Sequence, residues 1–320
     1  MKYLVLATIL FYSLVSCDSL NKEEKPEIEK KISKRDYSIT KENSYSDLFL
    51  DSMAMEKFIT DNQLNDSITR RMRSFYNTRN YQFAWFTSNG LTEQARGFWN
   101  IHDYQTTYKK DSSLIDKKLQ KRMDNLITEE SLTVSDKNKT DIETELKLTQ
   151  HFITYILNSF EEGFVKRKEM ERFVPRKKED VLALADSLVN KKHKDDKYYD
   201  DVNRPYRLLK MQLGHYLNIA RQGGWQPIST DKKSFKKGAS APEIAAIKRR
   251  LFLTRDLPVN DTSQVYNDTL EIAVKTFQQR FGFKPDGIID AAMIKQLNVP
   301  VEKRVEQLYM NLERMRWMWS

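Results

Sequence analysis

Cysteine is almost absent from this sequence, since Cys17 is the only one in 320 residues. With no second thiol, the chain cannot form an internal disulfide. No HExxH and no GxSxG stretch occurs, so the signatures of a zinc protease and of an α/β-hydrolase nucleophile are missing. None of the four histidines has a second histidine or a cysteine three or four positions away, and we therefore predict neither a metal site nor a cofactor. They are His102, His151, His193 and His215.

Blocks of one charge sign are also missing. The net charge of +9 arises from 54 Lys and Arg against 45 Asp and Glu, and the two signs are mixed along the chain. Only clustered charge produces an electrostatic footprint for nucleic acid. We therefore predict a diffusely charged, solvated surface and no nucleic-acid partner.

Long hydrophobic runs are confined to the N-terminus. Residues 1–16 are nearly all apolar after Lys2, which is too short for a bilayer crossing of about 20 residues but typical of a secretion signal. The run ends in Leu14-Val15-Ser16-Cys17, which resembles the lipobox of bacterial lipoproteins. That resemblance implies acylation of Cys17 and a lipid-anchored protein of the bacterial cell envelope, on the periplasmic side of a membrane or at the cell surface. The alternative is an uncleaved signal that happens to end in cysteine.

The segment after Cys17 is highly polar. It contains almost no apolar residues and charges of both signs, so it cannot bury enough surface to offset the entropy of ordering. We predict a disordered tether over residues 17–44.

Residues 45–234 read as a helical domain. Most of its apolar residues recur at spacings of three and four, the period of helices with one packed face. Ser88-Asn89-Gly90 predicts a turn, followed by a helix that begins near Thr92. Aromatic residues of this region can stack on sugars, but core packing is the favoured interpretation. They are Trp85, Phe86, Trp99 and Trp225.

Paired carboxylates at a fixed separation, which a glycan-cleaving enzyme requires, are not evident. The acidic pairs are adjacent in sequence, and neighbouring residues of a helix do not face each other. These pairs are Glu161-Glu162, Asp195-Asp196 and Asp200-Asp201. A hydrolase is therefore disfavoured.

Residues 235–299 form a second, smaller unit. Ser240 to Glu243 match a capping box with proline in the first turn, and Gly282 is suited to a left-handed helix end. Asp290 is placed to cap a third helix. We predict three short helices around a modest core.

This unit resembles the three-helix peptidoglycan-binding domain. The family pattern "AV..FQ...G...DG.........L" is present from Ala273 to Leu297. Asp290 and Met293 depart from it, since the family usually has Gly and Thr there. The resemblance implies peptidoglycan as partner, with Phe277, Gln278, Phe281, Asp286 and Gly287 as candidate binding residues. Gln278 and Asp286 offer hydrogen bonds and Gly287 a backbone turn, while Phe277 and Phe281 are packing residues; alternatively, all five only define the bundle.

The flanking stretches "YNTRNYQFAWFTSNGLTEQA", "HYLNIARQGGWQPI" and "LNVPVEKRVEQLYMNLERMRW" resemble, in this order, the large murein L,D-transpeptidases. The resemblance covers about Tyr76 to Trp319 and implies a mainly α fold, with a helical scaffold followed by the three-helix bundle and a long C-terminal helix. In that family, a following domain contains a histidine and a nucleophilic cysteine that forms a thioester with a stem peptide. Cys17 belongs to the signal, so we predict no catalytic residue and no transpeptidase activity in the chain as written.

The apolar stripe of residues 300–320 has the period of a packed helix, without an end signal before Ser320. We interpret it as a helix connecting to an absent catalytic domain, with apolar surface left exposed at Trp317, Met318 and Trp319. The sequence thus predicts a lipid-anchored, peptidoglycan-binding scaffold portion of an L,D-transpeptidase-like protein. Two alternatives stay open: an incomplete record of a full transpeptidase, and a structural envelope lipoprotein without specific recognition.

Overall fold

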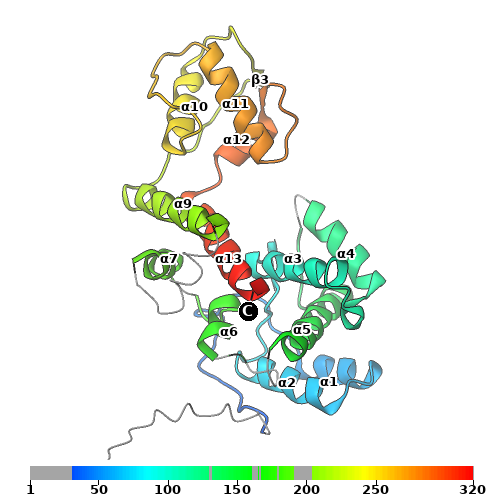
Figure 1. Cartoon of the computed structure of the whole chain (residues 1–320). Helices are drawn as coiled ribbons and strands as arrows, with labels where there is room; N and C mark the ends of the chain where they lie inside the picture. Colours follow the sequence, from blue (N-terminus) through cyan, green and yellow to red (C-terminus); the bar gives the residue numbers. More distant parts are fainter. Residues whose placement is uncertain are drawn as a thin grey trace, which may run out of the picture.

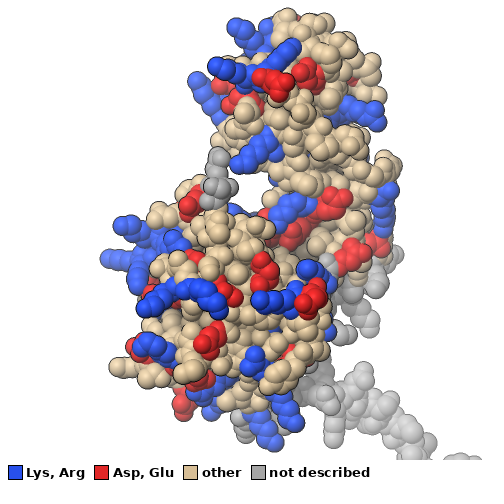
Figure 2. All heavy atoms as spheres, turned by 180° about the vertical axis from the view of Figure 1, so that it is seen from behind, with Lys and Arg blue, Asp and Glu red and all other residues tan. Residues whose placement is uncertain are grey.

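The computed structural model describes residues 31–129, 132–160, 165, 167–178, 180–190 and 204–319. The predicted signal peptide and the lipidation site at Cys17 lie outside these residues. Figure 1 shows two units, a large helical one and a small one at its far end. Figure 2 shows Lys and Arg interspersed with Asp and Glu over one face, in keeping with the mixed charge order of the sequence.

The large unit is built from helices and one short hairpin. Its helices in the described residues are α1 (Ser52–Asp61), α2 (Asp66–Asn77), α3 (Glu93–Thr107), α4 (Lys117–Thr128), α5 (Lys139–Ser159), α6 (Arg167–Phe173), α7 (Val181–Asn190), α9 (Arg204–Arg221) and α13 (Val301–Trp319), with a 3₁₀ turn η1 (Ser112–Leu114). None of the helices in the described part of the chain has both the length and the apolar character needed to cross a bilayer. The predicted mainly α fold is confirmed.

Side-chain caps fix where several helices begin. Thr92 accepts a hydrogen bond from the main-chain nitrogen of Ala95 at the start of α3, as the sequence predicts. The predicted turn before it joins β1 (Phe86–Thr87) to β2 (Gly90–Leu91), which pair antiparallel. Gly90 adopts φ +118°, a conformation that favours glycine.

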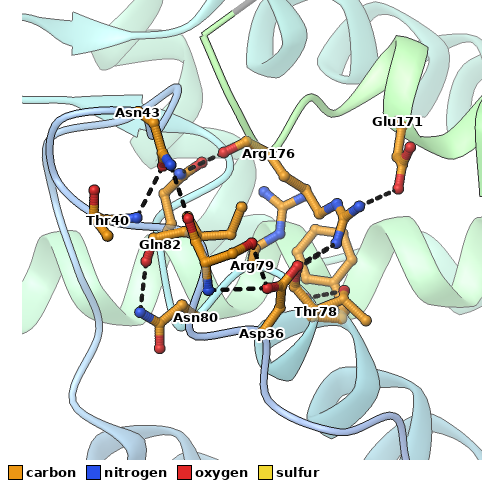
Figure 3. A network of polar contacts seen from close by, with 12 residues as sticks. Asp36, Thr40, Asn43, Thr78, Arg79, Asn80, Gln82, Glu171 and Arg176 are labelled. Carbon is orange, nitrogen blue, oxygen red and sulfur yellow. Dashed lines mark hydrogen bonds and ion pairs between the residues drawn. The ribbon is translucent and has the colours of Figure 1, made fainter.

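Residues 33–44, here called the N-terminal strap, pack on the large unit. Ile39 is fully buried, and the main-chain nitrogen of Asp36 donates to the carbonyl of Asn77 at 2.9 Å. Arg176 holds the strap from the other side: its guanidinium donates to the Thr78 carbonyl at 2.6 Å and pairs with Asp36 at 3.4 Å (Figure 3). The prediction of a disordered tether is therefore wrong for residues 33–44. Hydrophobic periodicity carries no information about hydrogen bonds to residues that are distant in the sequence. Residues 17–30 lie outside the described part.

Aromatic side chains fill the core of the large unit. Trp85 and Phe98 lie 5.3 Å apart between ring centroids, and each ring is 5.2 Å from that of Phe152. Phe86 and Trp99 are buried as well, so these aromatic residues are core residues rather than an exposed sugar platform. Burial of such large rings contributes a major share of the hydrophobic stabilisation.

Helix α13 completes this core. It packs against α9, α3, α7 and α6. Trp317 is buried, its ring centroid lies 4.7 Å from that of Phe173, and its carbonyl accepts a hydrogen bond from the Tyr155 hydroxyl at 2.5 Å. The predicted exposure of Trp317 is wrong, since the apolar stripe finds its partner within the same unit. Met318 is half-buried, and the side chain of Trp319 is not described.

The small unit lies between α9 and α13 in the chain. It consists of α10 (Pro242–Leu253), α11 (Asp268–Arg280) and α12 (Ala291–Leu297), with β3 (Ser234–Phe235) paired antiparallel to β4 (Ile289–Asp290). Its separate core contains, among others, Ile244, Leu251, Leu270, Val274, Phe277 and Leu297. The predicted three-helix arrangement is therefore present.

Two predicted helix caps of the small unit have different outcomes. Asp290 caps α12 by accepting from the main-chain nitrogen of Met293 at 2.9 Å, as predicted. The capping box at Ser240 is wrong, because α10 begins after Ala241 and has no side-chain cap. The main chain of Ser240 instead pairs with Val265, and the Glu243 carboxylate accepts from the Thr230 hydroxyl at 3.2 Å.

Candidate functional site

Gln278 organises the turn that follows α11. Its amide nitrogen donates to an Asp286 carboxylate oxygen at 3.0 Å and to the Ile288 carbonyl at 2.9 Å. Its amide oxygen accepts from the main-chain nitrogen of Gly287 at 2.9 Å. The Gln278 side chain is buried, so its polar atoms are engaged in holding the turn and not in facing solvent.

Gly287 lies at the tightest point of the turn. It adopts φ +75°, and a Cβ atom there would lie 3.1 Å from Cε of Lys275 and 3.2 Å from Cγ of Glu271. The Tyr266 hydroxyl donates to the Gly287 carbonyl at 2.7 Å. Glycine is therefore required by both conformation and space.

Asp286 is the member of this group that reaches solvent. One carboxylate oxygen accepts from Gln278 and from the main-chain nitrogen of Ile288 at 2.9 Å. The Ile288 bond is the main reason that the pKa of Asp286 lies below its usual value, with the Gln278 bond next. The second oxygen makes no hydrogen bond with a described residue, which leaves an anionic acceptor at the surface of the turn.

The two predicted aromatic residues are packing residues. Phe277 is buried, and its ring lies 4.4 Å from that of Phe281. Phe281 is only partly buried, with the guanidinium of Arg304 from α13 at 4.7 Å from its ring centroid. The structure thus places all five candidates around one turn and helix end. Gln278, Asp286 and Gly287 form the turn clamp, and Phe277 and Phe281 pack beneath it.

Residues that sequence reasoning missed surround the turn. Lys275 pairs with Glu271 at 2.7 Å, and Lys237 reaches Glu271 at 3.3 Å and also pairs with Asp268. The spacing of Glu271 and Lys275 is a helical i,i+4 pair visible in the sequence. Lys237 has no such signal, because its partners lie more than thirty positions along the chain.

The small unit is held to the large one by a polar joint. The Trp225 indole nitrogen donates to the Val299 carbonyl at 3.1 Å. The Asn298 amide exchanges two hydrogen bonds of 2.8 Å each with the main chain of Ile228. The two chain segments that enter and leave the small unit are therefore tied to each other.

Two arginines fill the joint. Arg250 is buried and donates to the Leu297 carbonyl at 2.9 Å, and Arg304 donates to the Gln296 carbonyl at 2.9 Å. Burial lowers the pKa of Arg250 to about 10 and also lowers that of Arg304. Both residues remain cationic at neutral pH, and the joint therefore contains buried positive charge.

The large unit contains a buried polar cluster centred on Glu145. Its carboxylate accepts from the main-chain nitrogens of Ala84 at 2.7 Å and Trp85 at 3.0 Å, and from the Tyr76 hydroxyl at 3.1 Å. Burial raises the pKa of Glu145 to about 7, against the opposing effect of these hydrogen bonds. The donors include main-chain groups of the segment before β1, so the cluster fixes this segment on α5.

Two histidines that appear isolated in the sequence meet in the core. Nε2 of His102 lies 3.1 Å from Nδ1 of His151 and 2.9 Å from the Leu114 carbonyl. Burial, followed by the proximity of His102, lowers the pKa of His151 to about 4. Within the described residues, no group of three or more His, Cys, Asp or Glu side chains is arranged to hold a metal ion.

Comparison with family models covers both units. Residues 240–297 match the family described as "Putative peptidoglycan binding domain". The small unit is a peptidoglycan-binding domain. Residues 70–213 match the family described as "Scaffold domain". No catalytic domain is matched, and no curated protein matches the chain.

The match and the fold agree on the small unit. All five candidate residues and the whole turn clamp lie within the matched peptidoglycan-binding domain. The Scaffold match ends inside α9, whereas the core of the large unit also includes Val305, Leu312 and Trp317 of α13. The chain therefore contains a Scaffold domain completed by a helix that follows the peptidoglycan-binding domain.

Proposed function

We propose that this protein is a lipid-anchored component of the bacterial cell envelope that binds peptidoglycan and acts as the non-catalytic scaffold portion of an L,D-transpeptidase-like, wall-crosslinking protein. The observation that carries the proposal is the family match of residues 240–297. The turn clamp of Gln278 and Gly287 supports it, because the hydrogen bonds of Gln278 hold the turn of the matched domain in place.

The scaffold role rests on the joint. A binding domain on a flexible linker would search the wall freely, whereas Trp225 and Asn298 tie both connecting segments together. Binding to the wall would then orient the large unit. Pre-organisation of this kind reduces the entropy lost when a second domain engages its substrate.

The lipid anchor rests on Leu14-Val15-Ser16-Cys17. Exchange of Cys17 for alanine should release the protein from the membrane fraction or block its processing. Unchanged fractionation together with unchanged gel mobility of Cys17→Ala would overturn the anchor.

The relationship to L,D-transpeptidases rests on the order of the resembling segments. The alternative, a full transpeptidase of which this sequence is an incomplete record, is decided by the coding DNA after Ser320. A histidine-and-cysteine domain there, in frame or after a frameshift, supports an enzyme, and unrelated sequence rejects it.

Binding to peptidoglycan is tested by co-sedimentation of purified residues 31–320 with insoluble sacculi. We expect retention at about 0.15 M salt, where screening acts beyond roughly 8 Å and removes diffuse charge attraction. Chitin particles serve as the control for a glycan without peptides. Loss of binding at this salt, or equal retention on chitin, would favour the structural lipoprotein without specific recognition.

A further inference from the structure

An open cleft of about 550 Å³ lies between the large unit and the peptidoglycan-binding domain. Its floor is one face of α9, where Arg207, Met211 and Asn218 follow at helical spacing. Val189 of α7 closes one side, and Arg255, two residues after the end of α10, closes the other. The volume lies within the range of about 300–1,000 Å³ that is usual for small-ligand sites, which favour domain interfaces.

Described residues fix the walls of this cleft. The His215 ring nitrogen Nε2 lies 2.9 Å from the Leu253 carbonyl, which joins α9 to the end of α10. On the other side, a Cβ atom at Gly214 would lie only 3.5 Å from a methyl group of Val189, so α7 and α9 pack closely. The cleft is therefore pre-formed.

The charges of the described cleft residues have one sign. Arg207, Lys210 and Arg255 line the cleft, and none of the described lining residues is acidic. Two acids next to lining residues in the described part of the chain pair with other cations: Asp186 of α7 pairs with Arg221, and Asp256 pairs with Arg280 at 2.7 Å.

Two of these cations are available to a ligand. Arg207 and Arg255 are exposed and form no ion pair with a described residue. A guanidinium donates two parallel hydrogen bonds to a carboxylate or a phosphate, which is the usual basis for recognition of these anions. The cleft therefore has the chemistry of an anion site.

We propose that this cleft binds the carboxylate groups of the peptides attached to a peptidoglycan strand held by residues 240–297. The inference rests on the proposed function, because it extends the binding surface from the peptidoglycan-binding domain to α9. Two further features favour a peptide over a phosphate polymer. Met211 and Val189 offer apolar contact for aliphatic side chains, and the amides of Gln212 and Asn218 suit peptide groups.

The test compares Arg207→Glu/Arg255→Glu with the wild type on two kinds of sacculi, intact ones and ones stripped of peptides by an amidase. We expect the double variant to bind intact sacculi about tenfold more weakly, because the charged hydrogen bonds from both guanidinium groups to peptide carboxylates are lost. Binding to stripped sacculi should not change. Equal binding by wild type and variant on intact sacculi, or equal losses on both kinds, would overturn the inference.

A matched control reverses two exposed charges of the large unit outside the cleft, Arg70→Glu/Lys139→Glu, and should leave binding to intact sacculi unchanged. A second double variant, Arg207→Gln/Arg255→Gln, removes the two charges without reversing them. It should also weaken binding to intact sacculi, but by less than the glutamate variant. Thermal unfolding by circular dichroism verifies that each variant is folded.

Soluble probes separate this inference from the proposed function. Titration with an acidic wall tetrapeptide, followed by NMR, should perturb α9 residues in the wild type and not in the double glutamate variant. Tetrapeptide binding without sacculus binding would reject the proposed function and support the cleft. Tighter, Arg207-dependent binding of polyphosphate than of the tetrapeptide would identify a phosphate ligand and overturn the peptide assignment.

Discussion

The guanidinium of Arg250 lies over the indole ring of Trp225, with its central carbon 3.4 Å from the ring centroid. Arg250 belongs to the peptidoglycan-binding domain and Trp225 to the segment that enters it. The contact is partly withdrawn from water, where a cation over an aromatic face is worth up to about 2 kcal/mol. It therefore couples the orientation of the domain to the chain segment that leads from α9.

Trp225→Ala should loosen this joint. We expect the free energy of unfolding to fall by about 2 kcal/mol, from lost apolar burial and the lost stacking on Arg250. A double-mutant cycle with Arg250→Met, measured by urea unfolding, should give a coupling above roughly 0.5 kcal/mol. Arg249→Ala, one position away and exposed, is the control and should behave as the wild type. Additive effects of the two substitutions would contradict a direct contact.

Gly287→Ala should destabilise the peptidoglycan-binding domain more than Gly282→Ala does. Both glycines adopt φ near +75°, but a Cβ atom meets neighbouring side chains only at Gly287. We expect a cost of about 1 kcal/mol at Gly282 from conformation alone, and a further 1–3 kcal/mol at Gly287 from crowding. Unfolding of the two variants under identical conditions measures the difference. Equal losses would mean that Lys275 and Glu271 move aside freely.

The buried carboxyl of Glu145 predicts a pH dependence of stability. Burial raises its pKa from 4.5 to about 7, so the folded state binds a proton more tightly than the unfolded state. The stabilisation of the folded state by this tighter proton binding is fully present below pH 4.5 and is lost as the pH rises towards 7. Glu145→Gln should remove it, so that the wild type loses stability relative to the variant between these pH values. His151 titrates in the opposite direction in both proteins and cancels in the comparison. A pH-independent difference would reject the raised pKa.

Arg176→Ala should release the N-terminal strap. The substitution removes the hydrogen bond to the Thr78 carbonyl and the ion pairs to Asp36 and Glu171. We expect a loss of about 1–3 kcal/mol and faster amide exchange over residues 33–44 than elsewhere, read by mass spectrometry. Lys34→Ala, an exposed change within the strap, should leave the exchange unchanged. Uniform acceleration over the whole chain would point to global destabilisation instead.

Local signals in the sequence predicted local structure well. Thr92, Gly90 and Asp290 each act through neighbours within a few residues, so their roles as caps and turn residues follow from the sequence alone. Ser240 is the exception, because its main chain pairs with Val265 across a loop.

Long-range pairing could not be predicted in the same way. The apolar stripe of α13 indicates a packed face but not its partner, which is the core around Phe152 and Phe173. His102 and His151 are 49 positions apart and meet only because α3 packs against α5. The cleft near Arg255 likewise depends on the placement of α9 beside the end of α10.

The peptidoglycan-binding domain is connected to the large unit by two backbone crossings, at residues 222–228 and 298–301, tied by Asn298 and Trp225. A pulling force on the domain would therefore be shared by these two chain segments and would reach α9 and α13 together. In Figure 1 the N-terminal strap lies at the opposite end of the molecule from this domain. A load applied between this domain and the strap would then pass lengthwise through the packed helices of the large unit.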